Sequence, residues 1–281
     1  MPDPQRLLNT LRRATFSCRQ TPGRQGGIVS LQDCDDVIIA GDMHGNVNNF
    51  RKLLQAADLA KHARRHLILQ ELIHGPFRYP LGGDSSHQLL DLFAALKCQY
   101  PNRVHALAGN HEVAQWTGQF IMKGTEDVLA LFDQGIDQAY APHADEVRAA
   151  YDDLFAVLPL VCRTANGVFM SHSLAAHLDR TPFDLSRLQK EPIPSAEYGS
   201  GGSAHALLWG RDVSEDNVNA FLKCVAAELL ITGHIPCERG YATPNSRQLI
   251  LDAEDTPACY CLFRADRTVT MRELVAGVGN L

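Results

Sequence analysis

The sequence predicts an α/β fold. Short apolar runs that are typical of buried strands recur along the chain, and amphipathic helical patterns lie between most of them. The runs are VIIAG, LILQEL, VHALAG, GVFMSHS and LLITGH. Each run contains or leads directly into aspartate, glutamate, asparagine or histidine. Because α/β sheets usually place ligand-binding groups at the carboxyl ends of their strands, these endings predict one shared site at a sheet edge.

Composition limits the classes of function. The 281 residues are 45% hydrophobic, enough for one large domain or two small ones with a substantial core. A net charge of -6 does not fit a nucleic-acid partner. No run of about 18 apolar residues predicts a membrane span, and the first residues show no apolar signal-peptide core. The 8 cysteines are scattered without a C-x-x-C pair, so we expect reduced thiols in a cytoplasmic protein.

We expect residues 1–34 to form an N-terminal helix and a glycine-rich loop, and residues 35–281 to form the main domain. The strand VIIAG leads into the loop GDMHGN, and a helical pattern follows to about Ala60. Asp42 and His44 lie two residues apart on this loop, so both can turn onto one divalent metal ion. Taken alone, this pair fits a helix N-cap and a surface histidine better. The recurrence of such residues at other strand ends favours the metal site.

The middle of the chain repeats this pattern. The predicted strand LILQEL ends at Glu71, and a loop rich in glycine and proline precedes the helix HQLLDLFAALKCQYP, which Pro101 ends. The next strand, VHALAG, runs into GNHE, which contains Asn110 and His111. We expect residues 113–160 to form a mainly helical, cap-like insertion.

The remaining strands complete the set of polar endings. GVFMSHS ends at His172 and LLITGH ends at His234. The intervening residues 174–206 are rich in proline, glycine and serine, and we expect a long loop that lines or covers the site. RQLILD, ACYCLFR and TVTMREL predict a meander of three strands at the end of the chain.

Three short motifs carry a resemblance to a known family. GDMHG, GNHE and ITGHIP occur in the order found in the calcineurin-like metallophosphoesterases, and the chain is most similar to the phosphoprotein phosphatase (Ser/Thr phosphatase) branch and its bacterial relatives. The resemblance covers about residues 35–265. It implies an α/β/β/α sandwich with mostly helical insertions near the active site.

The resemblance also implies a metal-dependent phosphoesterase. Such an enzyme hydrolyses a phosphomonoester or phosphoanhydride with water activated by two divalent metal ions, and manganese, iron, zinc and nickel all suit these ligands. The residues at metal-ligand positions are Asp42, His44, Glu71, Asn110, His172 and His234. His111 takes the position of the general acid. The substrate is then a phosphorylated small molecule or a phosphoprotein, and the oligomeric state stays open.

The second motif of the family, GD-x-x-DRG, is altered here to QELIHGP at residues 70–76. Glu71 takes the position of the aspartate that bridges both metals, and its extra methylene changes its reach. His74 takes the position of an aspartate that orients the catalytic histidine. Gly75 takes the position of an arginine that holds the substrate phosphate. Asp84 is a rival for the bridging role, although we prefer an N-cap role for it.

Arg211, in LLWGRD, is our candidate to replace that arginine, and Arg78 is a second candidate. An ordinary surface ion pair of Arg211 with Asp212 or Glu215 fits the sequence equally well.

Two further hypotheses compete with a working phosphoesterase. The altered second motif fits a catalytically weak or inactive relative that binds metal or a phosphorylated partner. An α/β domain with incidental histidines and aspartates is the third hypothesis. The presence of His111 beside a nearly complete ligand set favours the enzyme.

Overall fold

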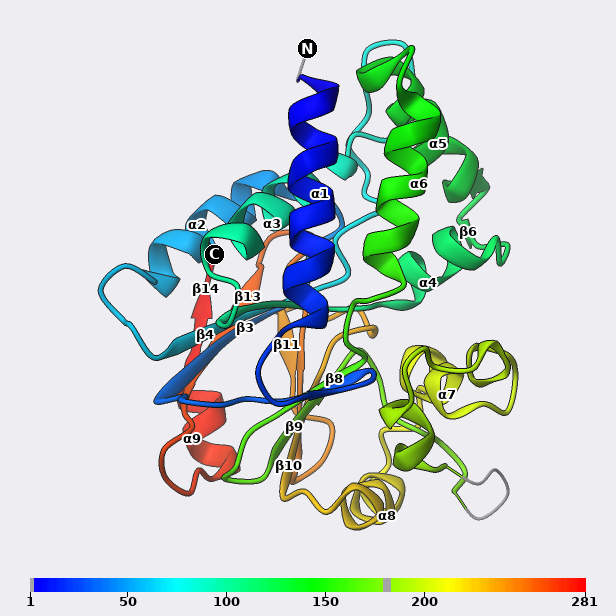
Figure 1. Ribbon diagram of the computed structural model, residues 1–281. Coiled ribbons are helices and arrows are strands. Elements are labelled where there is room, and N and C mark those ends of the chain that lie inside the picture. Colours follow the sequence, from blue (N-terminus) through cyan, green and yellow to red (C-terminus); the bar gives the residue numbers. More distant parts are fainter. Residues whose placement is uncertain (1–2, 179–182) are drawn as a thin grey trace.

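Two β-sheets pack face to face in the computed structural model, which describes residues 3–178 and 183–281, and helices cover the outer faces (Figure 1). This is the α/β/β/α sandwich expected from the sequence. Among the described residues, none of the helices has the length and apolar character needed to cross a bilayer.

The first sheet has five strands and carries the first three polar endings. Its order is β14 (Val278–Asn280), β13 (Cys259–Arg264), β3 (Asp36–Asp42), β4 (Arg65–Gln70) and β5 (Val104–Leu107). Strands β3, β4 and β5 are parallel, and β13 is antiparallel to β3. The crossovers contain helices α2 (Val47–Ala57) and α3 (His87–Gln99). Parallel strands bring the ends of β3, β4 and β5 to one edge.

The second sheet has seven strands. Its order is β1 (Arg24–Gln25), β2 (Ile28–Ser30), β8 (Val161–Arg163), β9 (Val168–Ser171), β10 (Leu229–Thr232), β12 (Gln248–Leu251) and β11 (Tyr241–Ala242). Strands β9, β10 and β12 are parallel. Helix α8 (Glu215–Val225) packs on the outer face, where Phe221 meets Phe169 edge to face at 5.5 Å.

Side chains alternate between two cores because successive residues of a strand face opposite sides. In β3, Val37 and Ile39 belong to the core between the sheets, whereas Ile38 and Ala40 pack toward the helices. All four side chains are fully buried. Burial of both faces explains why the central strands are continuous apolar runs.

The N-terminal segment packs onto the sandwich. Helix α1 (Pro4–Arg19) lies against α3 and α6 (Ala144–Phe155), with Leu8 and Leu11 buried (Figure 1). The glycine-rich stretch after α1 forms β1 and β2, which extend the edge of the seven-stranded sheet. The sequence analysis expected a loop there.

The region between β5 and β8 is mainly helical, as expected. Its elements are α4 (Asn110–Thr117), the hairpin strands β6 (Met122–Lys123) and β7 (Glu126–Asp127), α5 (Val128–Tyr140) and α6. The expected loop 174–206 instead contains two short 3-10 helices, η1 (Leu185–Gln189) and η2 (Ser195–Tyr198), and most of α7 (Ser203–Trp209). Part of that loop, residues 179–182, lies outside the described residues.

The predicted C-terminal meander is wrong. Strands β12 and β13 belong to different sheets, and the segment TVTMREL leads into helix α9 (Met271–Ala276). Thr270 caps this helix: its hydroxyl accepts from the Glu273 backbone, and the Glu273 carboxylate accepts from the Thr270 backbone. This capping box outweighs the β-branched residues that suggested a strand.

Candidate metal centre

The polar strand endings converge where the two sheets meet. Asp42 ends β3, Glu71 follows β4, and His172 follows β9. A β-bridge joins Asp42 to Asp252, just beyond β12, so the two sheets come together at this edge. The edge therefore collects side chains from both sheets.

Two groups of side chains have the spacing of a metal site. Asp42, Glu71 and His172 offer ligand atoms within 4.8 Å of one another, and so do His44, Glu71 and His111. Glu71 is common to both groups. Its Oε1 lies 3.5 Å from His172 Nε2, and its Oε2 lies 3.4 Å from His44 Nε2. Each carboxylate oxygen thus faces a different group, which is the arrangement a bridging ligand requires.

Asn110 and His234 join the first group through His172. Asn110 Oδ1 lies 2.8 Å and His234 Nδ1 lies 3.0 Å from His172 Nε2. The backbone N–H of His234 donates to Asp42 Oδ2 at 2.6 Å. The structure therefore brings together all the residues that the sequence analysis placed at metal-ligand positions.

Unpaired buried atoms show that this cluster fits a metal ion. Among the described residues, His234 Nε2 is buried without a hydrogen-bond partner, and Asp42 Oδ1 and His172 Nδ1 have no contact closer than the 3.5 Å that separates them from each other. An unpaired buried polar atom costs free energy, so such a set needs an explanation. Divalent transition metals take mixed nitrogen and oxygen ligands of this kind. The donor set and its unpaired atoms both fit one or more divalent cations.

The two carboxylates of the cluster favour a protonated, positively charged His172. Burial lowers the pKa of His172, but Glu71 and Asp42 raise it to about 9. Burial raises the pKa of Glu71 to about 7, and His172 opposes this rise. The two carboxylates thus hold a proton on a fully buried histidine. Metal binding would require release of that proton.

The backbone at the site is strained. His44, Glu71, His74 and His234 have φ values of 40°, 41°, 60° and 66°, in the left-handed region that residues other than glycine rarely adopt. Such strain clusters at functional sites, where the surrounding structure enforces it.

Two glycines explain how the altered second motif is accommodated. A Cβ atom on Gly75 would lie 1.7 Å from the carbonyl oxygen of His44, so an arginine cannot take this position without a backbone shift. A Cβ atom on Gly109 would lie 2.3 Å from Glu71 Oε1. Gly109 therefore leaves room for the longer carboxylate of Glu71.

His111 lies in the first turn of α4, beside the cluster. Its backbone N–H donates to Glu71 Oε1 at 3.0 Å, and its ring meets that of His44 edge to face at 5.0 Å. His111 Nδ1 lies 2.9 Å from His74 Nδ1. Burial, followed by the charge of His44, lowers the pKa of His111 well below its usual range. A neutral imidazole is therefore held next to the candidate ligands.

The two arginines proposed as phosphate ligands differ in their surroundings. Arg211 is exposed just after α7, and its charge contributes, after burial and His172, to lowering the pKa of His234. It therefore lies near the cluster. Arg78 donates to the carbonyl of Gly75 and to the carboxylate of Glu126, so its guanidinium is already engaged.

Asp84 does not support the rival bridging role. Its two carboxylate oxygens accept from the backbone N–H and the hydroxyl of Ser86 at 2.7 and 2.8 Å. Ser86, not Asp84, occupies the N-cap position of α3, and its side chain makes no capping hydrogen bond, so the expected N-cap role of Asp84 is wrong. The Ser86 hydroxyl in turn accepts from the backbone N–H of His74.

The sequence analysis missed several residues around the cluster. Lys123, on the β6–β7 hairpin, pairs with Glu254, whose Oε2 lies 4.0 Å from His44 Nε2. No sequence signal links these distant segments. Glu112 is fully buried and accepts backbone N–H groups of Leu72, Ile73 and Gly109, which ties the loop after β4 to α4. Its place in GNHE was a signal for that role.

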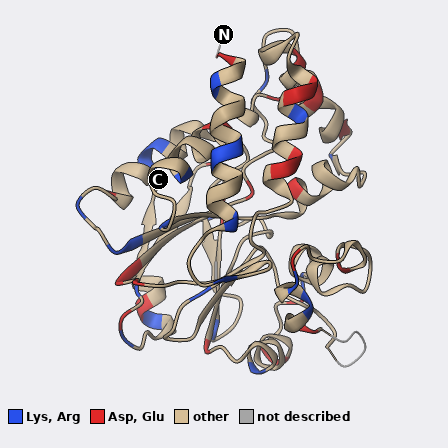
Figure 2. Cartoon of the chain, in the orientation of Figure 1, with Lys and Arg blue, Asp and Glu red and all other residues tan. Residues whose placement is uncertain are grey.

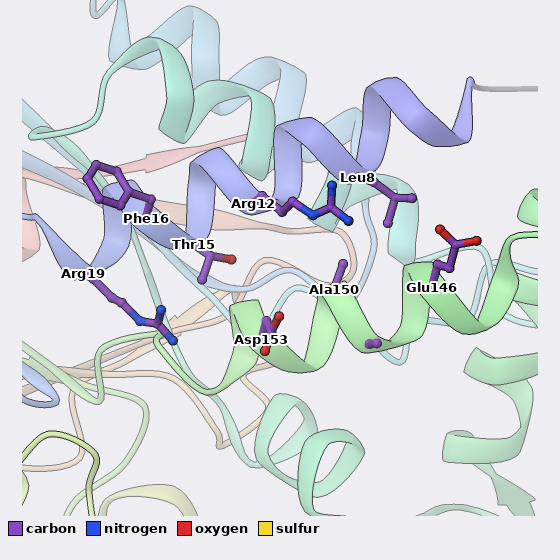
Figure 3. A pocket seen from close by; sticks show the side chains of 9 residues that line it. Leu8, Arg12, Thr15, Phe16, Arg19, Glu146, Ala150 and Asp153 are labelled. Carbon is purple, nitrogen blue, oxygen red and sulfur yellow. The ribbon is translucent and has the colours of Figure 1, made fainter.

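One surface groove lies away from the candidate metal centre. A groove of about 420 Å³ runs between α1 and α6, and Figure 3 shows Arg12, Phe16 and Arg19 along one wall and Glu146 and Asp153 along the other. None of the candidate metal ligands lines it.

Comparison with known proteins defines the class. Residues 36–238 match the family of calcineurin-like phosphoesterases, which is more than half of the chain. The chain therefore belongs to this family, and the resemblance seen in the sequence is confirmed.

Curated relatives are serine/threonine phosphatases. A probable serine/threonine-protein phosphatase of Encephalitozoon cuniculi is 22% identical over 239 residues, which covers 79% of this chain and 47% of the relative. The PP2A-like serine/threonine-protein phosphatase PPG1 of Saccharomyces cerevisiae is 26% identical over 111 residues, which covers 40% of this chain and 27% of the relative. The chain spans about half or less of these relatives.

Solved structures show the same fold. A protein serine/threonine phosphatase from Saccharomyces cerevisiae, with similarity to human phosphatase PP5, aligns with a TM-score of 0.68 at 15% identity and covers 93% of this chain and 82% of its own. A cold-active protein-tyrosine phosphatase of a psychrophilic Shewanella species aligns with a TM-score of 0.57 at 12% identity, covering 85% and 77%.

Proposed function

We propose that the chain is a metal-dependent phosphoesterase that hydrolyses a phosphomonoester or phosphoanhydride with two divalent metal ions. The observation that carries the proposal is Glu71, whose two oxygens face two different groups of candidate ligands. Membership of the calcineurin-like phosphoesterase family and the phosphatase relatives support it. The names of those relatives favour a phosphorylated protein as substrate, and a phosphorylated small molecule is the other candidate.

The ligands divide between the two ions. By the resemblance, Asp42 and His44 would hold one ion, and the other would be held by Asn110, His172 and His234, with Glu71 shared. The structure groups Asp42 with His172 instead, so Asp42 would be within reach of the second ion. Bound divalent ions would activate a water molecule and neutralise the phosphoryl oxygens. Asn110 adds no negative charge to the cluster, so the site stays attractive to a phosphate.

Two further residues act on the substrate in this proposal. His111 takes up a proton from water and gives it to the leaving oxygen, the role of a general acid. Because burial lowers the pKa of His111, its ring is neutral before this step. Lys123 is our candidate for binding the substrate phosphate. It projects from the hairpin toward Glu254 beside His44, and a substrate phosphate can replace Glu254 as its partner. Arg211, the first candidate of the sequence analysis, is the alternative to Lys123.

A second candidate function is binding without turnover, of a metal ion or a phosphorylated partner. The clash that a side chain at Gly75 would make with His44 favours it, because the arginine that the family uses to hold phosphate cannot stand there.

One experiment separates these functions. The purified protein is analysed for metal content and assayed for hydrolysis of p-nitrophenyl phosphate with added Mn²⁺. About two ions per chain with turnover supports the phosphoesterase, and bound metal without turnover supports the binding protein. A chain that takes up no metal under any loading condition contradicts both.

A further inference from the structure

A chain of hydrogen bonds leads from His111 to helix α5. His111 Nδ1 lies 2.9 Å from His74 Nδ1, and His74 Nε2 lies 2.8 Å from Gln115 Oε1. The Gln115 amide nitrogen then donates to Asp133 Oδ1 at 3.1 Å. We call His111, His74, Gln115 and Asp133 the relay.

The carboxylate of Asp133, at the end of the relay, fixes which group donates and which accepts in each hydrogen bond. An ionised carboxylate only accepts hydrogen bonds, so Gln115 must turn its NH₂ group toward Asp133 and its oxygen toward His74. His74 must then carry its proton on Nε2. In a neutral ring this leaves Nδ1 as an acceptor, and it can only accept from an N–H on Nδ1 of His111. Nε2 of His111 takes no part in the relay.

Separate elements hold the relay in place. His74 follows β4 and is fully buried, and Phe132 packs edge to face against its ring at 5.5 Å. Gln115 lies four residues after His111 on α4, so the two side chains share one face of that helix. Asp133 is on α5, where its backbone carbonyl accepts from Arg148. The relay thus depends on the helical insertion as well as on the strand endings.

We propose that Gln115 and Asp133 are positioning residues that fix the tautomer of His74 and, through it, hold the proton of His111 on Nδ1, so that Nε2 is the nitrogen that takes up a proton from solvent water and passes it to the leaving oxygen. The proposal rests on the proposed phosphoesterase function. It assigns to the insertion a role in catalysis that does not involve contact with the substrate.

The variant Asp133→Asn tests the direction of the relay with little change of shape. An asparagine side chain both donates and accepts, so the Gln115 amide can turn over and His74 is no longer restricted to one tautomer. The matched control is Asp152→Asn: Asp152 lines the same cavity of about 150 Å³ as Gln115 and Asp133, and no hydrogen bond joins it to Gln115 in the described structure.

The first readout does not depend on activity. Two-bond ¹H–¹⁵N correlation spectra of the metal-free protein distinguish the two tautomers of each histidine. We expect the Nε2–H form for His74 and the Nδ1–H form for His111 in the wild type and in Asp152→Asn. In Asp133→Asn we expect a mixture at His74. A wild-type His74 in the Nδ1–H form, or an Asp133→Asn spectrum identical to the wild type, would overturn the relay.

The second readout connects the relay to proton transfer. A phenolate leaving group needs protonation more than p-nitrophenolate does. In Asp133→Asn we therefore expect kcat for phenyl phosphate to fall on the order of 10- to 100-fold, with a smaller loss for p-nitrophenyl phosphate and little change in KM. Equal losses for both substrates would mean a merely structural role. If the wild type shows the expected tautomers but no turnover, the proposed phosphoesterase function is wrong, whereas the hydrogen-bond directions of the relay are confirmed.

Discussion

Glu71 is the residue that the two candidate ligand groups share. It has a φ of 41°, it is 2% exposed, and it approaches Gly109 so closely that a Cβ atom there would meet its Oε1. These features together place a longer side chain where the family has an aspartate. Gly109 thus leaves room for the longer side chain of Glu71.

Replacing Glu71 with glutamine should reduce the bound metal from two ions to one or none. The substitution keeps the shape of the side chain but removes the negative charge that both ligand groups share. Elemental analysis of the purified variant checks this. Asp84→Asn is the matched control, because Asp84 is equally buried and its carboxylate binds Ser86 outside the cluster. Two ions retained in Glu71→Gln would rule out Glu71 as the bridge.

Replacing His111 with asparagine should lower turnover by about 10²–10⁴-fold, the usual worth of general acid catalysis, and leave the metal content unchanged. The assay is hydrolysis of phenyl phosphate, with metal analysis of the same sample. His143→Asn is the control, since His143 lies at the start of α6 beside Glu146. Loss of metal from His111→Asn would show instead that His111 is a ligand, as its spacing to His44 and Glu71 also allows.

At the scale of elements, the neighbouring strands β4 and β5 carry a buried histidine pair with no part in the metal centre. The rings of His66 and His105 stack at 5.3 Å, with His66 Nδ1 3.0 Å from His105 Nε2. His66 Nε2 also lies 3.1 Å from the carbonyl oxygen of Gln32. Burial lowers the pKa of His66 from 6.5 to about 4, so the folded protein holds this ring neutral at a pH where the unfolded chain protonates it.

This pair should make the fold sensitive to mild acid. The unfolded chain binds more protons than the folded one between pH 6.5 and about 4, so the free energy of unfolding falls as the pH is lowered through this window. His66 accounts for at most about 3 kcal/mol of that fall. Urea unfolding at several pH values measures it.

The comparison of variants isolates His66 from other titrating groups. His66→Gln should flatten the pH dependence of the unfolding free energy, whereas His62→Gln, at an exposed position, should not change it. Parallel curves for the wild type and His66→Gln would show that His66 does not contribute.

At the scale of the whole molecule, the candidate ligands connect the two sheets. Asp42, His44 and Glu71 come from the five-stranded sheet, and His172 and His234 come from the seven-stranded sheet. Charge elsewhere follows a different pattern: Figure 2 shows basic bands along α1 and acidic bands along the neighbouring α6. The metal centre is therefore the point where the two halves of the sandwich depend on each other.

Metal removal should lower the stability of the entire domain. An ion that binds only the folded protein stabilises it by about 2.7 kcal/mol at a free concentration of 100 times its Kd. We expect the melting temperature to fall on addition of a chelator and to recover with Mn²⁺ or Zn²⁺, as measured by calorimetry. The recovery should be smaller in Glu71→Gln. A melting temperature that changes with neither chelator nor added metal would argue against a metal ion that joins the sheets.

The residue pattern by itself determined the α/β class and the candidate ligands, and the resemblance to the family implied the sandwich. Five of the six lie at a strand end or within two positions of it, and Asn110 lies three positions beyond β5, so a local pattern of apolar run, glycine and polar residue locates them. Glu112, within GNHE, and Gln115, one helical turn beyond His111, were also within reach of local reasoning.

Only the tertiary structure decided which distant segments meet. The pairing of Gln115 with Asp133, the approach of Lys123 and Glu254 to His44, and the separation of β12 from β13 each join residues far apart in the chain. Local propensity does not encode such contacts, because they depend on how whole elements pack. The same is true of Gly75. A side chain is excluded at this position by the carbonyl oxygen of His44, which lies thirty-one residues earlier in the chain on the neighbouring loop.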